Sequence, residues 1–425
     1  IMPYEKRFSL YGQWKNDLYR LPELRAAQAA TEKEAKGILK RISKDNIKQS
    51  GRNLAKASHS NPTIFFTVAL NQVQAYDNLI QPLVESAKYL SQFEYDIFSF
   101  NLVDALSNPE KERTKQDGTN ISLWLKSLAA FCGTLFRRYA MMDCTPILQY
   151  LVNQLKANNS KDLVIMSELI TKMSGIEPLA NLADAQIAAL TGGRHLHMEA
   201  MMAANALTGS KERIAYRRSG QRLLHALVES KLSVPLLILV AQQRQACIHL
   251  VPESEAHLKY LGNLYDSCQE VLLQYVEFLF NHLETADYAS LVPSLHHLCV
   301  RFGIEPAMAF YIARPKLVHS MRQVEAAEAA ERLRAELTAS RAKAKAAEDD
   351  KAASGEAQQN GAEAGATDAN QDGDVEMEDA DAAKSDSKSP AKSVENSKDG
   401  NAAESNGVAT MQGDEASPEA TKPWH

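Results

Sequence analysis

The sequence predicts an all-α, HEAT-like helical solenoid followed by a disordered acidic tail. Apolar residues between positions 1 and 320 recur at steps of three and four, which is the period of an amphipathic helix. The same region contains no convincing run of alternating β-branched residues. From Arg322 to the end, small and charged residues replace the large apolar ones. A segment of that composition cannot offset its chain entropy by burial.

Changes in composition divide the chain into four parts. We expect an aromatic and basic helical first segment over residues 1–60 and the solenoid over residues 61–320. A charged Ala-rich helix over residues 321–353 and the acidic tail over residues 354–425 follow. The net charge of the whole chain is -6, but residues 322–425 alone carry 12 Lys and Arg against 23 Asp and Glu. The excess of acid therefore belongs to the C-terminal part.

Three apolar stripes predict long helices near residues 121–139, 163–173 and 258–283. The second of these helices should close at Ser174-Gly175, because glycine favours the left-handed turn after a helix. Helix starts are predicted where a side-chain oxygen precedes a proline, at Asn61-Pro62, Asn108-Pro109 and Thr145-Pro146. No residue-level repeat is visible, so the solenoid is inferred from helix lengths.

Composition and motifs argue against catalysis, cofactors and metal. The sequence lacks a phosphate-binding loop, a dinucleotide fingerprint, HExxH and GxSxG, so we expect no enzyme and no cofactor. Five widely spaced cysteines indicate buried thiols in a reducing compartment. The pairs His195/His197 and His296/His297 have no ligand partner at metal-binding spacing, which favours structural roles over metal binding.

No membrane association is expected. The longest apolar run, residues 234–241, is far shorter than a membrane span. No charged and then apolar leader opens the chain. Because the sequence begins at Ile1 rather than Met, we expect it to be part of a longer protein.

A row of basic residues near the N-terminus is the first candidate binding site. On a continuous helix, each step of four residues would rotate the row by about 40° around the helix axis. Ile38, Ile42 and Ile47 would then face the core beside the row, and Gly51 is a possible interruption of the helix. Contact with nucleic-acid phosphates and a solvated helix face are both open interpretations. The row comprises Lys36, Lys40, Arg41, Lys44, Lys48, Arg52 and Lys56.

Two further candidate surfaces are predicted to meet partners. In residues 4–19, aromatic residues at near-helical spacing alternate with Lys and Arg. Tyr11, Trp14 and Lys15 are the candidates here. They either contact a partner protein or RNA, or pack between helices. Residues 108–118 carry both positive and negative side chains. This pattern suits contact with a complementary partner surface, and it is equally typical of a capped helix start. The candidate residues of this loop are Glu110, Lys111, Glu112 and Arg113.

Ser389 and Ser417 each precede a proline in the predicted tail. Proline-directed phosphorylation there would add negative charge to an already acidic segment. Chance matches in a Ser-rich tail are the alternative.

Several segments, taken in order, resemble the THO complex subunit 2 family over about residues 3–320. They are YGQWKND (11–17), KRISKDNIKQSGR (40–52), SHSNPT (58–63), YDNL (76–79), NPEKER (108–113), MSGIE (173–177), TGG (191–193) and AQQR (241–244). In this family the subunit is a scaffold of a nuclear assembly that packages nascent mRNA and couples transcription to export.

The resemblance implies a helical-repeat fold similar to the middle domain of the large translation-initiation scaffold. It also implies a non-enzymatic role in the nucleus, with other THO complex subunits and a DEAD-box RNA helicase as partners and mRNA as a further possible partner. A helical protein that binds RNA directly, without a helicase, is the alternative function.

Overall fold

The computed structural model describes residues 2–43, 45–115, 119–203, 209–252 and 257–359. These residues form helices, and the only β pairings among them are two isolated bridges, Thr114 with Ile121 and Ile176 with Met202. The N-terminal helices are α1 (Tyr4–Asp17), η1 (Leu18–Arg20), α2 (Pro22–Leu39), α3 (Ile47–Ser60), α4 (Pro62–Ala75), η2 (Asp77–Leu79), α5 (Ile80–Ser86), η3 (Ala87–Tyr89) and α6 (Gln92–Leu106).

A second set of helices completes the fold. They are α7 (Leu123–Arg138), α8 (Thr145–Lys156), α9 (Leu163–Ser174), η4 (Leu179–Asn181), α10 (Asp184–Ala189), α11 (Arg194–Ala200), α13 (Ser210–Glu229), α14 (Ser233–Leu250), α15 (Leu258–His282), α16 (Thr285–Leu291), η5 (His297–Arg301) and α17 (Pro306–Gln359).

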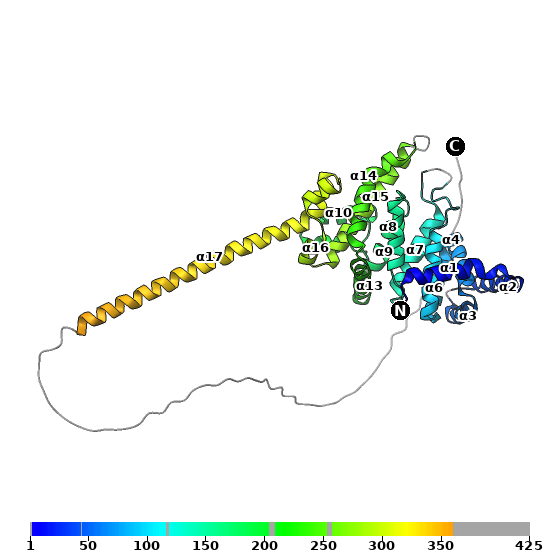
Figure 1. The fold of residues 1–425 in the computed structure, drawn as a ribbon, viewed down its shortest axis with the longest axis horizontal. Coiled ribbons are helices and arrows are strands. Elements are labelled where there is room, and N and C mark those ends of the chain that lie inside the picture. Colours follow the sequence, from blue (N-terminus) through cyan, green and yellow to red (C-terminus); the bar gives the residue numbers. More distant parts are fainter. Residues whose placement is uncertain (1, 44, 116–118, 204–208, 253–256, 360–425) are drawn as a thin grey trace, which may run out of the picture. The chain divides into compact units, whose positions relative to one another are not determined.

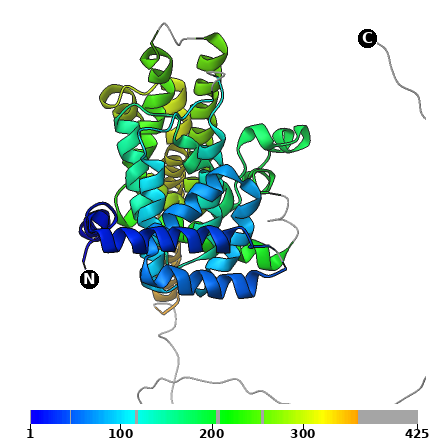
Figure 2. The same ribbon diagram turned by 90° about the vertical axis from the view of Figure 1, so that its right-hand side faces the viewer.

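The helices pack as a continuous row within the first compact unit, residues 1–345. Helix α2 packs on α4, α4 on α6 and α7, α7 on α9, and α9 on α13 and α15, which in turn contacts α14. Helix α1 lies across α4 and α6 (Figures 1 and 2). A single large hydrophobic cluster runs from Tyr11 to Ala313. The prediction of an all-α helical solenoid is confirmed.

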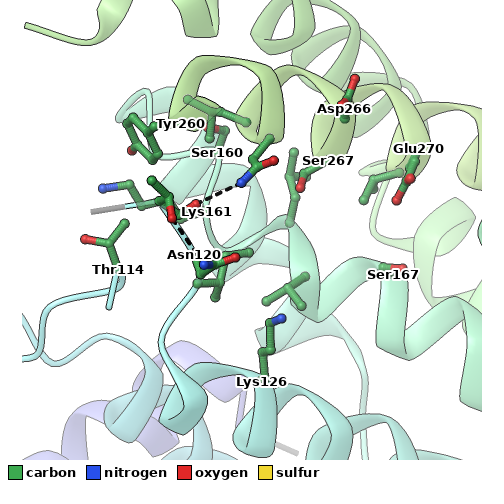
Figure 3. Close-up of a pocket in the computed structure, with 17 residues that line it drawn as sticks. Thr114, Asn120, Lys126, Ser160, Lys161, Ser167, Tyr260, Asp266, Ser267 and Glu270 are labelled. Carbon is green, nitrogen blue, oxygen red and sulfur yellow. Dashed lines mark hydrogen bonds between the residues drawn. The ribbon is translucent and has the colours of Figure 1, made fainter. Parts of the chain in front are cut away.

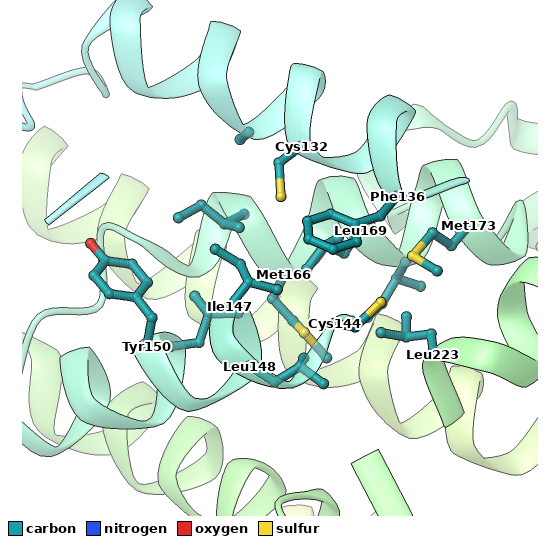
Figure 4. Packing of buried hydrophobic residues seen from close by; sticks show 14 of the residues in the cluster. Cys132, Phe136, Cys144, Ile147, Leu148, Tyr150, Met166, Leu169, Met173 and Leu223 are labelled. Atoms are coloured by element: carbon teal, nitrogen blue, oxygen red, sulfur yellow. The ribbon is translucent and has the colours of Figure 1, made fainter. Parts of the chain in front are cut away.

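The centre of this core lies between α7, α8, α9 and α13. Cys132 and Phe136 of α7 face Met166 and Leu169 of α9, with side chains of α8 beside them (Figure 4). All four named side chains have no exposed surface. Because the buried faces of these helices are apolar, burial from water holds the row of helices together.

Two glycines are required by this packing. A Cβ at Gly133 of α7 would lie 2.6 Å from the carbonyl oxygen of Glu168 in α9, so the close approach of the two helices depends on a missing side chain. Gly175 ends α9 with φ +76°, the left-handed conformation that glycine adopts without strain.

The long predicted helices are confirmed as α7, α9 and α15. Two proline signals are confirmed as well, because Pro62 opens α4 and Pro146 lies in the first turn of α8. The side chains before these prolines do not cap their helices. Asn61, for example, accepts from the Tyr19 hydroxyl at 3.0 Å and donates to Thr31 Oγ1 at 3.1 Å.

The predicted helix start at Asn108-Pro109 is wrong. Residues 107–122 contain no helix in their described part. The Asn108 side chain accepts from the backbone N–H of Glu110 at 2.9 Å, which closes a tight turn instead of a helical one. The chain then runs on to the bridge between Thr114 and Ile121.

Helix α17 crosses the predicted boundary at residue 320 and includes the charged Ala-rich segment. Met308 and Ile312 at its start are buried, whereas residues 320–347 are all exposed. The helix continues to Gln359, six residues past the predicted end at 353. The second compact unit is residues 346–425. Residues 360–425, with Ser389 and Ser417, lie outside the described residues.

Candidate partner and nucleic-acid surfaces

The predicted basic row is divided between two helices rather than forming one ridge. Helix α2 ends at Leu39 and α3 begins at Ile47. Gly51 does not interrupt a helix: it lies buried inside α3, against the ring of Tyr89. Ile38 and Ile42 pack against the core as expected, and Ile47 is half-buried. Lys44 lies outside the described residues.

The break in the row creates a groove. Side chains of α2 and α3 enclose about 1040 Å³, with Lys36, Lys40, Arg41 and Lys56 of the predicted row among the lining residues. Lys48 and Arg52 are exposed but do not line it. Besides the four predicted bases, the groove has Lys33, Glu32 and Glu34 in its lining. Basic residues therefore outnumber acidic ones in the lining, and we call this cavity the basic groove.

The aromatic stripe of α1 is used in packing against α6. Arg7 donates to Asp96 at 2.7 Å, the Tyr11 hydroxyl donates to the same carboxylate at 2.7 Å, and Lys15 pairs with Asp104 at 2.6 Å. Tyr11 is only 8% exposed, and burial, together with the bond to Asp96, raises its pKa.

Trp14 also packs against the core, and its buried indole N–H has no hydrogen-bond partner within the described residues. The structure thus supports the packing interpretation of the stripe. A partner role for Tyr11, Trp14 and Lys15 stays a prediction.

The loop after α6 divides its charges between the interior and the surface. Arg113 donates to Asp162 at 2.8 Å and to the Leu106 carbonyl oxygen at 3.1 Å. Lys111 donates to Gln74 Oε1 and lies 5.6 Å from the centre of the Trp124 ring, and burial lowers its pKa.

Glu110, Glu112 and Lys115 of the same loop are exposed. They, and not Lys111 or Arg113, are therefore the loop charges available to a partner. Charge reversal at Arg113 would place its carboxylate beside the buried carboxylate of Asp162, so that change would disturb the fold as well as any partner contact.

A pocket of about 430 Å³ adjoins this loop (Figure 3). It lies between the chain around Thr114 and Ile121, α7, α9 and α15. Asn263 of α15 donates to the Thr119 carbonyl oxygen at 3.2 Å and so joins the loop to the helix. The charged residues that line the pocket are Lys126, Lys161, Asp266 and Glu270.

Both signs of charge meet in this pocket. Lys161 lies 5.8 Å from the centre of the Tyr260 ring, and partial burial together with Asp266 raises the pKa of Glu270. Sequence reasoning missed these residues because they come from three separate segments, residues 114–126, 160–167 and 260–271. With the exposed loop charges, they form what we call the mixed-charge surface: Glu110, Glu112, Lys115, Lys126, Lys161, Asp266 and Glu270.

The thiol and histidine candidates have structural surroundings. Burial raises the pKa of Cys144 to about 12 and that of Cys132 well above its usual value, as expected of buried thiols. Two cysteines depart from this expectation: Cys299 is only partly buried, and a hydrogen bond with Cys268 lowers the pKa of Cys247 to about 7. Within the described residues, no three His, Cys, Asp or Glu side chains are grouped to hold a metal ion. His197 instead faces the carboxylate of Glu277 at 3.1 Å.

The fold and these surfaces define a helical-repeat protein with charged grooves on a rigid core. Comparison with known proteins specifies the family. Residues 1–52 match the family model of the THO complex subunit 2 N-terminus, and residues 54–129 match that of the transcription- and export-related complex subunit. The chain belongs to the THO complex subunit 2 family.

Three relatives show how widely the similarity extends. The chain is 46% identical to THO complex subunit 2 of Homo sapiens over 318 residues, 38% identical to that of Arabidopsis thaliana over 319 residues and 26% identical to that of Saccharomyces cerevisiae over 327 residues. These matches cover 75%, 74% and 76% of the chain but only 19%, 17% and 20% of the relatives. The chain thus spans about a fifth of the length of the curated relatives it matches.

Hydropathy gives one further observation. Taken singly, none of the described helices combines the length and apolar character of a membrane span, although α13 and α14, bent by 92° at their junction, meet the criterion as a pair.

Proposed function

We propose that this chain is a non-enzymatic scaffold segment of a nuclear THO complex that acts in mRNA processing and mRNA export. Its partners would be other THO complex subunits and a DEAD-box RNA helicase. The observation that carries the proposal is the match over three quarters of the chain to proteins whose names place them in that complex.

The mixed-charge surface supports helicase binding. A DEAD-box enzyme works by closing two lobes on RNA and ATP, so a rigid partner that favours the closure-competent arrangement raises turnover without contributing a catalytic group. The continuous core sets the distance between the exposed loop charges and the pocket of Figure 3. Alternating charges of both signs suit recognition of a complementary protein surface.

The test measures affinity and ATP turnover with a purified DEAD-box RNA helicase. We expect the chain to hydrolyse no ATP alone and to raise RNA-stimulated hydrolysis by the helicase modestly. The variant Glu110→Lys, Glu112→Lys, Lys115→Glu should weaken binding by about tenfold or more, with an unchanged melting temperature, because these side chains are exposed.

A matched control reverses exposed charges elsewhere, with Glu23→Lys and Arg25→Glu on α2, and should bind normally. Unchanged affinity of the loop variant would remove the mixed-charge surface from the proposal. Absence of association at micromolar concentrations would contradict helicase scaffolding by this chain.

Direct RNA binding is a second candidate function, favoured by the basic groove. Lys36 of α2, Lys40 and Arg41 directly after α2, and Lys56 of α3 line this groove together, an arrangement that suits contact with nucleic-acid phosphates. The partner roles of Tyr11, Trp14 and Lys15 and phosphorylation of Ser389 and Ser417 remain proposals beside it.

A further inference from the structure

A second groove, of about 490 Å³, lies between the chain around Leu190–Arg194, helix α15 and the first turns of α17. The α17 residues that line it are Tyr311, Arg314, Pro315, Val318 and Arg322. Their spacing in steps of one, three and four places them on one helix face. We call this cavity the α15–α17 groove. It is separate from the mixed-charge surface and from the basic groove.

A buried carboxylate oxygen in the groove lacks a donor. Glu277 is 4% exposed and lines the groove. Its Oε2 pairs with Nε2 of His197 at 3.1 Å, whereas its Oε1 is buried with no hydrogen-bond partner in the described part of the chain. A buried acceptor without a donor costs free energy. An N–H or O–H group brought to this oxygen would remove that cost, and because the oxygen has almost no accessible surface, its neighbours must shift to admit one.

The charge of Glu277 is already balanced. His197 donates from Nδ1 to the Leu190 carbonyl oxygen at 2.9 Å, and its Nε2 faces the Glu277 carboxylate. Because both ring nitrogens face acceptors, this position favours the protonated, cationic imidazole and raises the pKa of His197. A neutral donor consequently fits Glu277 Oε1 better than an ammonium or guanidinium group does.

The walls and the rim define the rest of the ligand. Val276, Phe280 and Val318 give apolar contact area. Pro315 has no N–H, so the Tyr311 carbonyl cannot receive its usual helical bond. At the rim, Arg194, Arg314 and Arg322 are exposed and form no ion pair with a carboxylate among the described residues.

We propose that the α15–α17 groove binds an acidic peptide segment of a partner protein that inserts a tryptophan side chain. The indole body fits the apolar walls, its N–H donates to Glu277 Oε1, and flanking Asp or Glu residues pair with the three rim arginines.

The test uses the full chain and a fluorescein-labelled peptide, Gly-Asp-Asp-Trp-Asp-Asp-Gly, with fluorescence anisotropy as readout. We expect saturable binding. The same peptide with 1-methyltryptophan carries N–CH3 in place of the N–H donor and should bind about tenfold more weakly or worse, as expected for loss of a hydrogen bond to a charged group. The peptide with Lys in place of Asp should not bind.

Protein variants test the groove from its exposed side. Arg314→Glu together with Arg322→Glu should weaken binding at least about tenfold, and Val318→Trp should abolish it by filling the groove. Arg334→Glu, exposed on the same helix, is the matched control and should bind as the unmodified chain does. These positions are exposed, so the test does not depend on replacing the buried Glu277.

Three outcomes would overturn the proposal. One is the absence of saturable binding up to about 0.5 mM peptide. Another is equal affinity for the tryptophan and 1-methyltryptophan peptides. The third is displacement of the peptide by a single-stranded RNA hexamer that binds more tightly and depends on the same arginines. None of these outcomes bears on helicase binding at the mixed-charge surface.

Discussion

Arg113 and Asp162 form an ion pair of 2.8 Å that fastens the loop after α6 to the N-terminus of α9. Asp162 is 1% exposed, and its second oxygen accepts from the Tyr150 hydroxyl at 2.5 Å. A buried carboxylate with both oxygens occupied is stable only while its cationic partner is present.

Removing this partner should destabilise the fold. We expect Arg113→Ala to lower the free energy of unfolding by about 3–5 kcal/mol, because the Asp162 charge stays buried and uncompensated. Urea unfolding followed by circular dichroism measures the change. Lys115→Ala, on the same loop but exposed, should change it by less than about 0.5 kcal/mol. Equal effects of the two variants would show that the ion pair has no special role.

The contact of α7 with α9 should not tolerate a methyl group. Gly133→Ala forces the helices apart against the Glu168 carbonyl oxygen and should cost about 1–3 kcal/mol of unfolding free energy. Gly262→Ala in α15 is the matched control: nothing lies within 4 Å of the position that its new methyl group would take, and the change should stabilise by about 0.4–1 kcal/mol. A loss of stability in Gly133→Ala and a gain in Gly262→Ala would separate the effect of packing from that of helix propensity.

Stability should depend on pH through His197. The hydrogen bond with Glu277 is the main cause that raises the pKa of His197 in the folded chain. Its contribution is therefore fully present below the unfolded histidine pKa of about 6.5 and is lost as pH rises through the raised folded value. The stability difference between the unmodified chain and His197→Gln should shrink as pH rises above about 6.5.

His282 provides the opposite case. Burial lowers its pKa, so its contribution is present above the unfolded histidine pKa and declines as pH falls through that value. His282→Gln should therefore differ most from the unmodified chain in alkaline buffer. Parallel pH trends for the two variants would contradict the assigned directions.

RNA affinity should depend on the basic groove and not on the whole basic row. Charge reversal at Lys40, Arg41 and Lys56 should weaken binding to a single-stranded RNA and reduce the log-log salt slope by about 0.7 per lost phosphate contact. Lys48→Glu with Arg52→Glu reverses bases outside the groove and should have a smaller effect. Equal effects would favour diffuse attraction, and no effect in either variant would indicate a solvated face.

Local pattern was sufficient for most of the helices. The stripes that predict α7, α9 and α15 depend only on residues three and four positions apart, which is the distance over which a helix repeats. Pro62 and Pro146 mark their helices because a fixed φ acts locally. The resemblance to the THO complex subunit 2 family likewise follows from segments read in order along the chain.

Contacts between residues far apart in the sequence determined the loop conformation and the candidate surfaces. The turn at Asn108-Pro109 has good capping chemistry, yet the chain there is held by Arg113, whose partner Asp162 lies 49 positions away. The basic row became a groove because α2 and α3 are separate helices. His197 and Glu277 are 80 positions apart and meet only because α11 and α15 are close together.

The sequence by itself thus determined the fold class, the main helices and the family, because hydrophobic period and proline geometry are properties of neighbouring residues. Only the tertiary structure decided which charges are buried in pairs and which remain exposed. The free energy of a charge depends on its desolvation and on the groups that packing brings within a few ångströms, and no local pattern specifies those groups.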